Sequence, residues 1–167
     1  MELGLIWGYW TAQPPPDFLD LTVEAERQGY DMGWTAESWG SDAFSPLAYI
    51  AAHTDRIRLG TGVVQIAART PTAVAMHAMT LDHLSDGRAV LGIGAAWFET
   101  EHTAFGLEFG SGFGERLDWL DESVELMAGM LRDGVATARG EHYHAVEVRN
   151  DPAPLQARLP ILIGGGG

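Results

Sequence analysis

The sequence predicts an α/β fold built on a parallel sheet. Short apolar segments that end near glycines, such as residues 3–8 and 89–94, alternate along the chain with longer amphipathic segments. The apolar segments lack a regular polar alternation, which is typical of strands buried on both faces of a parallel sheet. Two architectures share this pattern, a doubly wound sheet and a (β/α)8 barrel, and the residue pattern leaves both open.

The expected elements follow one another in strand–helix order. Strands are expected over residues 3–8, 32–37, 57–66, 89–94 and 159–164. Helices are expected over residues 14–29, 45–53, 70–87 and 115–134, and a hairpin over residues 135–148. Ser45 and Thr70 are the expected N-caps of the second and third helices, because a proline follows each of them at the first helical position. Gly134 is expected to end the fourth helix.

The apolar residues of the helices recur at helical spacing and predict the faces that are buried. In the first helix, Phe18, Leu21 and Ala25 share one face. The helix over residues 115–134 has the strongest pattern, and its apolar stripe consists of Leu117, Leu120, Val124, Met127 and Leu131.

The composition excludes several classes of protein. The chain of 167 residues has no cysteine, a formal net charge of −13, and no lysine among its ten basic residues. These absences exclude thiol chemistry, a lysine Schiff base and a Walker-type phosphate loop. The acidity argues against a nucleic-acid partner, and no apolar run approaches the ~20 residues that span a bilayer. We therefore expect a cytoplasmic protein that acts on a small molecule.

Function in both architectures gathers where the strands end. Residues expected at those ends are Trp7, Tyr9, Trp10, Glu37, Ser38, Trp39, Gln65, Gly94, Ala95, Trp97 and the four glycines at 164–167. Polar groups between aromatic walls suit a large planar ligand, so Trp7, Trp39 and Trp97 are the expected substrate pocket. Glu37 is the best-placed carboxylate and His102 the best-placed histidine, and both are candidate catalytic residues.

Two other patterns carry less weight. The stretch LGIGAAW resembles a dinucleotide fingerprint, but Trp97 occupies the place of the third glycine, so a nicotinamide site is disfavoured. His142 and His144 lie on one side of an expected strand without a third ligand in a motif. A solvated hairpin is therefore favoured there, and no metal site is expected.

Three longer stretches together carry a family resemblance. They are AESWGSDAFSPLAYIAAHTDRIRLGTGVVQIAARTP, TLDHLSDGRAVLGIGAAW and PILIGGGG. They resemble the luciferase-like flavin and deazaflavin oxidoreductases, and within them the actinobacterial branch that uses coenzyme F420. The resemblance implies a TIM-type barrel and hydride transfer between F420 and an organic substrate. An FMN-dependent luciferase-like monooxygenase is the alternative.

The resemblance also implies roles for individual residues. A non-prolyl cis peptide bond that backs the cofactor ring is implied at Gly62–Val63, and Gln65 falls where the family contacts the ring edge. The terminal glycines match a loop near the phosphate-bearing side of the cofactor. The expected cofactor-binding residues are Ser38, Gly62, Val63, Gln65, Gly94, Ala95, Gly164, Gly165, Gly166 and Gly167.

The chain departs from the family at several points. Relatives with an acid–histidine pair after the second strand differ from Glu37–Ser38 here, and Trp97 stands where some carry a glutamate. The proton donor is therefore unassigned, and a sugar phosphate is not the expected substrate.

The length is a further departure from the family. Five expected strands, where a barrel needs eight, predict that residues 1–167 are the N-terminal part of one barrel, cut off in a mid-protein glycine loop. The alternatives are a non-catalytic half-barrel binding or assembly module, which a second copy would complete as a homodimer, and an inactive fragment.

Overall fold

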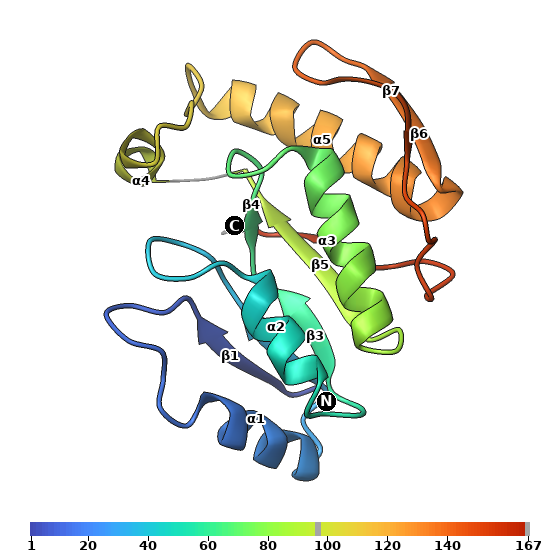
Figure 1. The fold of residues 1–167 in the computed structure, drawn as a ribbon. Helices are drawn as coiled ribbons and strands as arrows, with labels where there is room; N and C mark the ends of the chain where they lie inside the picture. Colours follow the sequence, from blue (N-terminus) through green and yellow to red (C-terminus); the bar gives the residue numbers. More distant parts are fainter. Residues whose placement is uncertain (96–97, 166–167) are drawn as a thin grey trace.

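The computed structural model describes residues 1–95 and 98–165, and its centre is a parallel sheet (Figure 1). The strands of this sheet are β1 (Gly4–Gly8), β2 (Met32–Thr35), β3 (Arg58–Thr61), β4 (Val64–Gln65), β5 (Ala89–Gly94) and β8 (Ile161–Ile163). Each strand runs parallel to its neighbours, in the order β1-β2-β3-β5-β4, and β8 also pairs with β5. Because β3 and β4 both pair with β5, they are two pieces of one strand position.

The helices lie between the strands in the chain. They are α1 (Phe18–Arg27), α2 (Phe44–Ala51), α3 (Pro71–Leu84), α4 (Glu99–Ala104) and α5 (Phe113–Asp133). The strands follow chain order across the sheet, so right-handed crossovers place the connecting helices on one face, as Figure 1 shows for α1, α2 and α3. A doubly wound sheet would have helices on both faces. The arrangement is therefore the wall of a TIM-type barrel.

A separate hairpin interrupts the strand–helix order. It consists of β6 (Val135–Arg139) and β7 (His144–Arg149), which pair antiparallel in their own sheet. The hairpin lies along α5 (Figure 1), and the Glu122 carboxylate of α5 accepts hydrogen bonds from the backbone N–H groups of residues 141, 142 and 143. This confirms the predicted hairpin.

The core fills the space between the helices and the sheet. Its fully buried side chains include Leu47, Ile50, Leu59, Val74, Leu91, Ile93 and Met127. Two predicted core residues are wrong, because Leu21 is 51% and Leu117 40% exposed. In α1 the buried position belongs to Thr22, whose hydroxyl accepts a hydrogen bond from the Trp7 indole of β1. Near Leu117, the start of α5 instead packs through the guanidinium of Arg116, which lies 4.1 Å from the Phe109 ring centroid.

The helix starts agree with the sequence in one case and differ in another. Thr70 caps α3, since its hydroxyl accepts from the N–H of Ala73 at 3.3 Å. Ser45 is not the cap of α2, which begins at Phe44. The carboxylate of Asp42 accepts from the N–H groups of Phe44 and Ser45, each at 2.8 Å. An aspartate carboxylate complements the partial positive charge of a helix start better than a serine hydroxyl does.

Two strands and one helix also differ from the expectation. The second strand ends at Thr35, and the third strand, expected to run unbroken over residues 57–66, is divided at Gly62–Val63. The Gly62–Val63 peptide bond is cis, as the family resemblance implied. Helix α4 was not predicted. Across the part of the chain that the structure describes, no helix is both long and apolar enough to cross a membrane.

Candidate functional site

A pocket opens where β2 and β4 end, with α4 on its far side. Its described lining is Glu37, Ser38, Trp39, Gly40, Ser41, Asp42, Gln65, Ala68, Arg69, Glu101, Phe105 and Leu107. The loop after β2 supplies half of these residues, and the segment that follows β4 supplies Ala68 and Arg69. The parallel strands therefore deliver polar groups from distant parts of the chain to one edge, as the sequence predicted.

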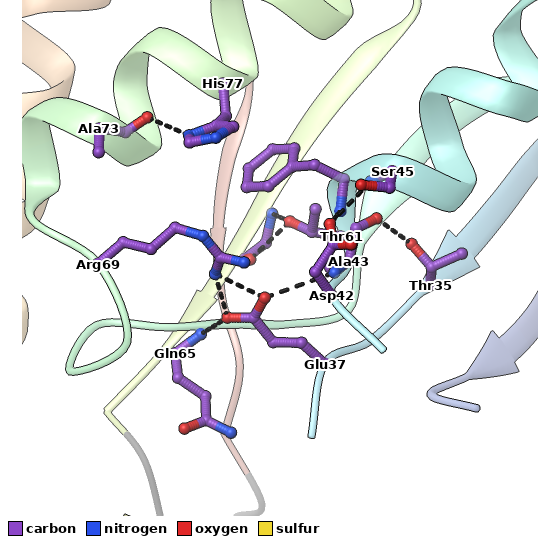
Figure 2. Close-up of polar contacts among 12 residues, drawn as sticks. Thr35, Glu37, Asp42, Ala43, Ser45, Thr61, Gln65, Arg69, Ala73 and His77 are labelled. Atoms are coloured by element: carbon purple, nitrogen blue, oxygen red, sulfur yellow. Dashed lines mark hydrogen bonds and ion pairs between the residues drawn. The ribbon is translucent and has the colours of Figure 1, made fainter. Parts of the chain in front are cut away.

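Glu37 is the polar centre of this pocket (Figure 2). Its carboxylate oxygens lie 2.7 and 2.6 Å from Nη1 of Arg69. The same carboxylate accepts from the backbone N–H of Gln65 at 3.0 Å and of Ala43 at 3.4 Å. With its side chain only 6% exposed, Glu37 ties the loop after β2 to the segment around β4 and to the start of α2. The geometry favours a positioning role, and the catalytic role of Glu37 stays a prediction.

Arg69 carries the positive charge of the pocket, and that charge is already paired. Besides Glu37, its guanidinium lies 5.9 Å from the ring centroid of Phe44, which stacks on His77 at 5.2 Å. Arg69 is the basic residue of the described lining, which also holds the carboxylates of Glu37, Asp42 and Glu101. The described pocket therefore carries a net negative charge.

The carboxyl group of Asp42 adds to this charge. Burial raises its pKa, but hydrogen bonds from Ser45 and Phe44 and the nearby Arg69 outweigh this, so the pKa of Asp42 lies below its usual value. Asp42 is therefore ionised at neutral pH.

An aromatic cluster forms one wall. The ring of Trp39 lies 5.7 Å from that of Phe105 and 6.1 Å from that of Phe98, measured between centroids. Trp39 comes from the loop after β2 and Phe105 from the end of α4, and both line the pocket. Trp39 is 52% exposed, so part of this residue stays accessible from solvent. Trp39 therefore lies in the wall of this pocket, and its role in binding a substrate stays a prediction.

Sequence reasoning missed Glu101. Its side chain is buried, at 4% exposure, yet it lines the pocket and its Oε1 lies 3.1 Å from Nε2 of Gln65. The helix that presents it, α4, was not predicted. The available signal was the acidic run after the fourth strand, FETEH, in which only His102 was singled out.

The segment from Gly62 to Gln65 contains one fully buried residue, Val64. Gly62 is exposed and Val63 and Gln65 are half-buried. The Val63 side chain is seated among glycines of the neighbouring strands. A Cβ at Gly94 would lie 2.9 Å from Val63 Cγ2, and one at Gly164 would lie 2.8 Å from Val63 Cγ1.

Beyond Val63, a Cβ at Gly165 would meet nothing within 4 Å. Small residues, an unobstructed glycine and an amide side chain fit a planar, polar-edged cofactor. The cofactor-binding roles of these residues stay predictions.

The remaining predicted residues lie in other surroundings. His102 is buried, its Nδ1 lies 3.1 Å from the Phe98 carbonyl oxygen, and its ring packs edge-on against Phe109. Within residues 1–95 and 98–165, its Nε2 has no hydrogen-bond partner, and its catalytic role stays a prediction. Trp7 packs against α1, with its ring 5.2 Å from that of Phe18, and the structure does not bring it to this pocket.

The other predicted site residues lie in the pocket, near a strand end, or outside the described residues. Ser38 lines the pocket, and Ala95 is half-buried just after β5. Trp97, Gly166 and Gly167 lie outside the described residues. No cluster of three metal-ligating side chains occurs among the residues that are described.

The fold and the site define a class: a TIM-type barrel protein with a polar and aromatic pocket at the carboxyl ends of its strands, suited to a planar ligand. The chain belongs to the luciferase-like monooxygenase family, whose model matches residues 6–167.

Three similar proteins illustrate this membership. The chain is 40% identical over 178 aligned residues to the protein named "Putative coenzyme F420-dependent oxidoreductase Rv3520c" of Mycobacterium tuberculosis; all of this chain and 50% of that protein are covered. It is 33% identical to the F420-dependent glucose-6-phosphate dehydrogenase of Kineococcus radiotolerans, covering 92% of this chain and 48% of that one.

Among solved structures, the F420-dependent tetrahydromethanopterin reductase of Methanopyrus kandleri matches with a TM-score of 0.86 at 22% identity. That match covers 99% of this chain and 50% of the reductase. The chain thus spans about half the length of the relatives it matches.

Proposed function

We propose that the chain is the N-terminal part of a deazaflavin-dependent oxidoreductase that transfers a hydride between coenzyme F420 and an organic substrate. The observation that carries this proposal is the Gly62–Gln65 segment, in which Gly62 is exposed and the half-buried Gln65 brings its amide to the pocket, in a chain whose relatives at 40% and 33% identity are named for F420. The cofactor, when bound, supplies the hydride chemistry.

The residues of this chain would bind and orient that ring. Gly62 and Val63 would lie behind one face of it, and the Gln65 side chain would reach its edge. Glu37 holds the Gln65 backbone through the N–H···Oε1 hydrogen bond of 3.0 Å, so the amide edge starts from a fixed position. Trp39 and Phe105 would exclude water from the reacting face.

The charge of the pocket supports an uncharged organic substrate. A phosphorylated substrate needs an unpaired cation, and Arg69 in the described lining is already neutralised by Glu37. The carboxylates of Asp42 and Glu101 would repel a phosphate group further. The exposed ring of Trp39 would instead contact an apolar or aromatic substrate surface.

An FMN-dependent monooxygenase is the second candidate, because the family model that matches the chain describes luciferase-like monooxygenases. The surface at Gly62–Gln65 suits an isoalloxazine ring as well as a deazaflavin. A non-catalytic binding or assembly module is the candidate from a different class, and a defined oligomer that binds no cofactor would favour it.

The test is a fluorescence titration of the purified chain with F420 and, in parallel, with FMN. We expect saturable binding of F420 that is tighter than that of FMN. The variant Gln65→Ala should weaken binding, while Gln28→Ala, at an exposed glutamine on α1, should leave it unchanged. Tighter binding of FMN would select the monooxygenase, and no binding of either cofactor would overturn the proposal for this chain.

A further inference from the structure

We infer that Glu101 is a positioning residue that fixes the orientation of the Gln65 carboxamide, so that the pocket presents a hydrogen-bond acceptor to its ligand. The ligand it selects is a ring that offers an N–H donor at its edge. The part of this inference that concerns the cofactor rests on the proposed function, whereas the orientation of the amide does not.

The contact joins two elements that are distant in the chain. Glu101 comes from α4 and Gln65 from β4, and Oε1 of Glu101 lies 3.1 Å from Nε2 of Gln65. Glu101 is almost completely buried, and it forms no ion pair with a basic side chain of the described residues. Gln65 is thus the described group that satisfies this buried carboxylate, which makes the contact costly to lose.

The chemistry of the two groups decides which way the amide points. An ionised carboxylate only accepts hydrogen bonds, whereas a carboxamide has a donating NH2 end and an accepting oxygen end. The NH2 end of Gln65 must therefore face Glu101. Since the carboxamide is planar, its Oε1 then points away from Glu101.

Within the part of the chain that the structure describes, that oxygen has no hydrogen-bond donor. No described residue donates a hydrogen bond to Oε1 of Gln65, while the backbone N–H of the same residue is held by Glu37. Figure 2 shows the Gln65 side chain extending away from Glu37 and Arg69. Both ends of the residue are thus fixed by carboxylates, and its oxygen remains as an acceptor for a ligand such as the imide N–H of a flavin or deazaflavin ring.

The orientation can be tested without any cofactor by NMR of the 15N-labelled chain. The Gln65 side-chain NH2 signal, assigned by its loss in Gln65→Ala, should show two well-separated protons that exchange slowly with water. Glu101→Gln should shift these signals and speed their exchange with water, because a neutral carboxamide accepts a hydrogen bond less strongly than a carboxylate and can also donate one. Glu99→Gln, at an exposed glutamate of the same helix, should leave them unchanged.

An unchanged Gln65 signal in Glu101→Gln would overturn the inference. If that variant does not fold, as judged by circular dichroism, Glu101→Asp provides the same test, since its shorter side chain withdraws the acceptor from Nε2.

The ligand preference is tested with FMN and its N3-methyl derivative, which lacks the imide N–H. The unaltered chain should bind FMN about tenfold more tightly than the methylated form, as expected for one lost hydrogen bond to a fixed acceptor. This ratio should fall to about twofold in Glu101→Gln and stay near tenfold in Glu99→Gln. Equal binding of both ligands by the unaltered chain would overturn the preference. Absence of all binding would overturn the proposed function, while the NMR result would still decide the orientation.

Discussion

Arg69 and Glu37 form a close ion pair, in which Nη1 of Arg69 lies 2.6 Å from Oε2 of Glu37 and 2.7 Å from its Oε1. The two residues are 32 positions apart, after different strands of the sheet. The pair therefore joins the loop after β2 to the segment after β4, and it sets the relative position of the two sides of the pocket.

Loss of the arginine should destabilise the fold. In Arg69→Gln the Glu37 carboxylate stays buried without its cation, which we expect to lower the free energy of unfolding by about 3 kcal/mol. Urea denaturation followed by circular dichroism measures this. Arg132→Gln breaks the exposed pair between Arg132 and Asp133 and should change the stability by less than about 0.5 kcal/mol. Equal effects of the two substitutions would contradict a structural role for the Glu37–Arg69 pair.

We expect the β6–β7 hairpin to be held less firmly on α5 at acidic pH, because the Glu122 carboxylate that binds it becomes protonated. Burial raises the pKa of Glu122, but hydrogen bonds from the N–H groups of residues 143, 142 and 141 lower it more, so the net shift is downward from 4.5. A lowered pKa contributes stability above the unfolded value, and this contribution is lost as the pH falls from about 4.5 through the folded value.

The matched variant for this prediction is Glu122→Gln, which removes the titrating group. The difference in thermal midpoint between the two proteins should be largest near pH 7 and should shrink below pH ~4.5. A difference that stays constant between pH 7 and pH 3 would show that the ionised carboxylate contributes nothing to docking.

The cap of α3 should contribute measurably to stability. Thr70→Ala removes the hydroxyl that accepts from the Ala73 N–H, and we expect a loss of about 1 kcal/mol in the free energy of unfolding. Thr70→Ser keeps the hydroxyl and should retain most of the stability. If both variants lose the same amount, the effect belongs to the methyl group and not to the cap.

We expect substitutions at Gly164 and Val63 to have non-additive effects on the free energy of unfolding, because the two side chains would contact each other. Gly164→Ala would bring a methyl group to 2.8 Å from Val63 Cγ1, and we expect it to cost about 1 kcal/mol or more. In a Val63→Ala background the same change should cost clearly less, which a double-mutant cycle by urea denaturation measures. Gly165→Ala is the control, because its Cβ would meet no atom within 4 Å. Purely additive effects would contradict the contact.

Much of the fold could be predicted from local signals. The proline that follows Thr70, the glycine after α5 and the apolar strands are all read from neighbouring residues, and they predicted the order of the main elements correctly. Local signals failed where a residue distant in the chain determines which side chain is buried. Thr22 is buried in place of Leu21 because the indole of Trp7 donates to it, and no pattern within α1 reveals that indole.

The same reason limits what the sequence predicted of the site. Glu37 and Gln65 were found because they lie at or just after the carboxyl ends of strands, where functional residues of a barrel lie. The pairing of Glu37 with Arg69 and of Gln65 with Glu101 depends on contacts across more than thirty residues, |i−j| of 32 and 36. The spacing of residues in a single sequence does not indicate such contacts.

The β6–β7 hairpin has a consequence for how this chain can diversify. Among the strands of the described residues, β6 and β7 pair with each other alone, outside the parallel sheet, and Glu122 of α5 binds the tip of the hairpin. Insertions or deletions at its tip would therefore shift no strand of the barrel wall out of register. Changes in length there would alter the contacts of residues 141–143 with Glu122 but not the barrel wall, and we expect length variation among homologues to concentrate there while the spacing between β2, β4 and α4 stays constant.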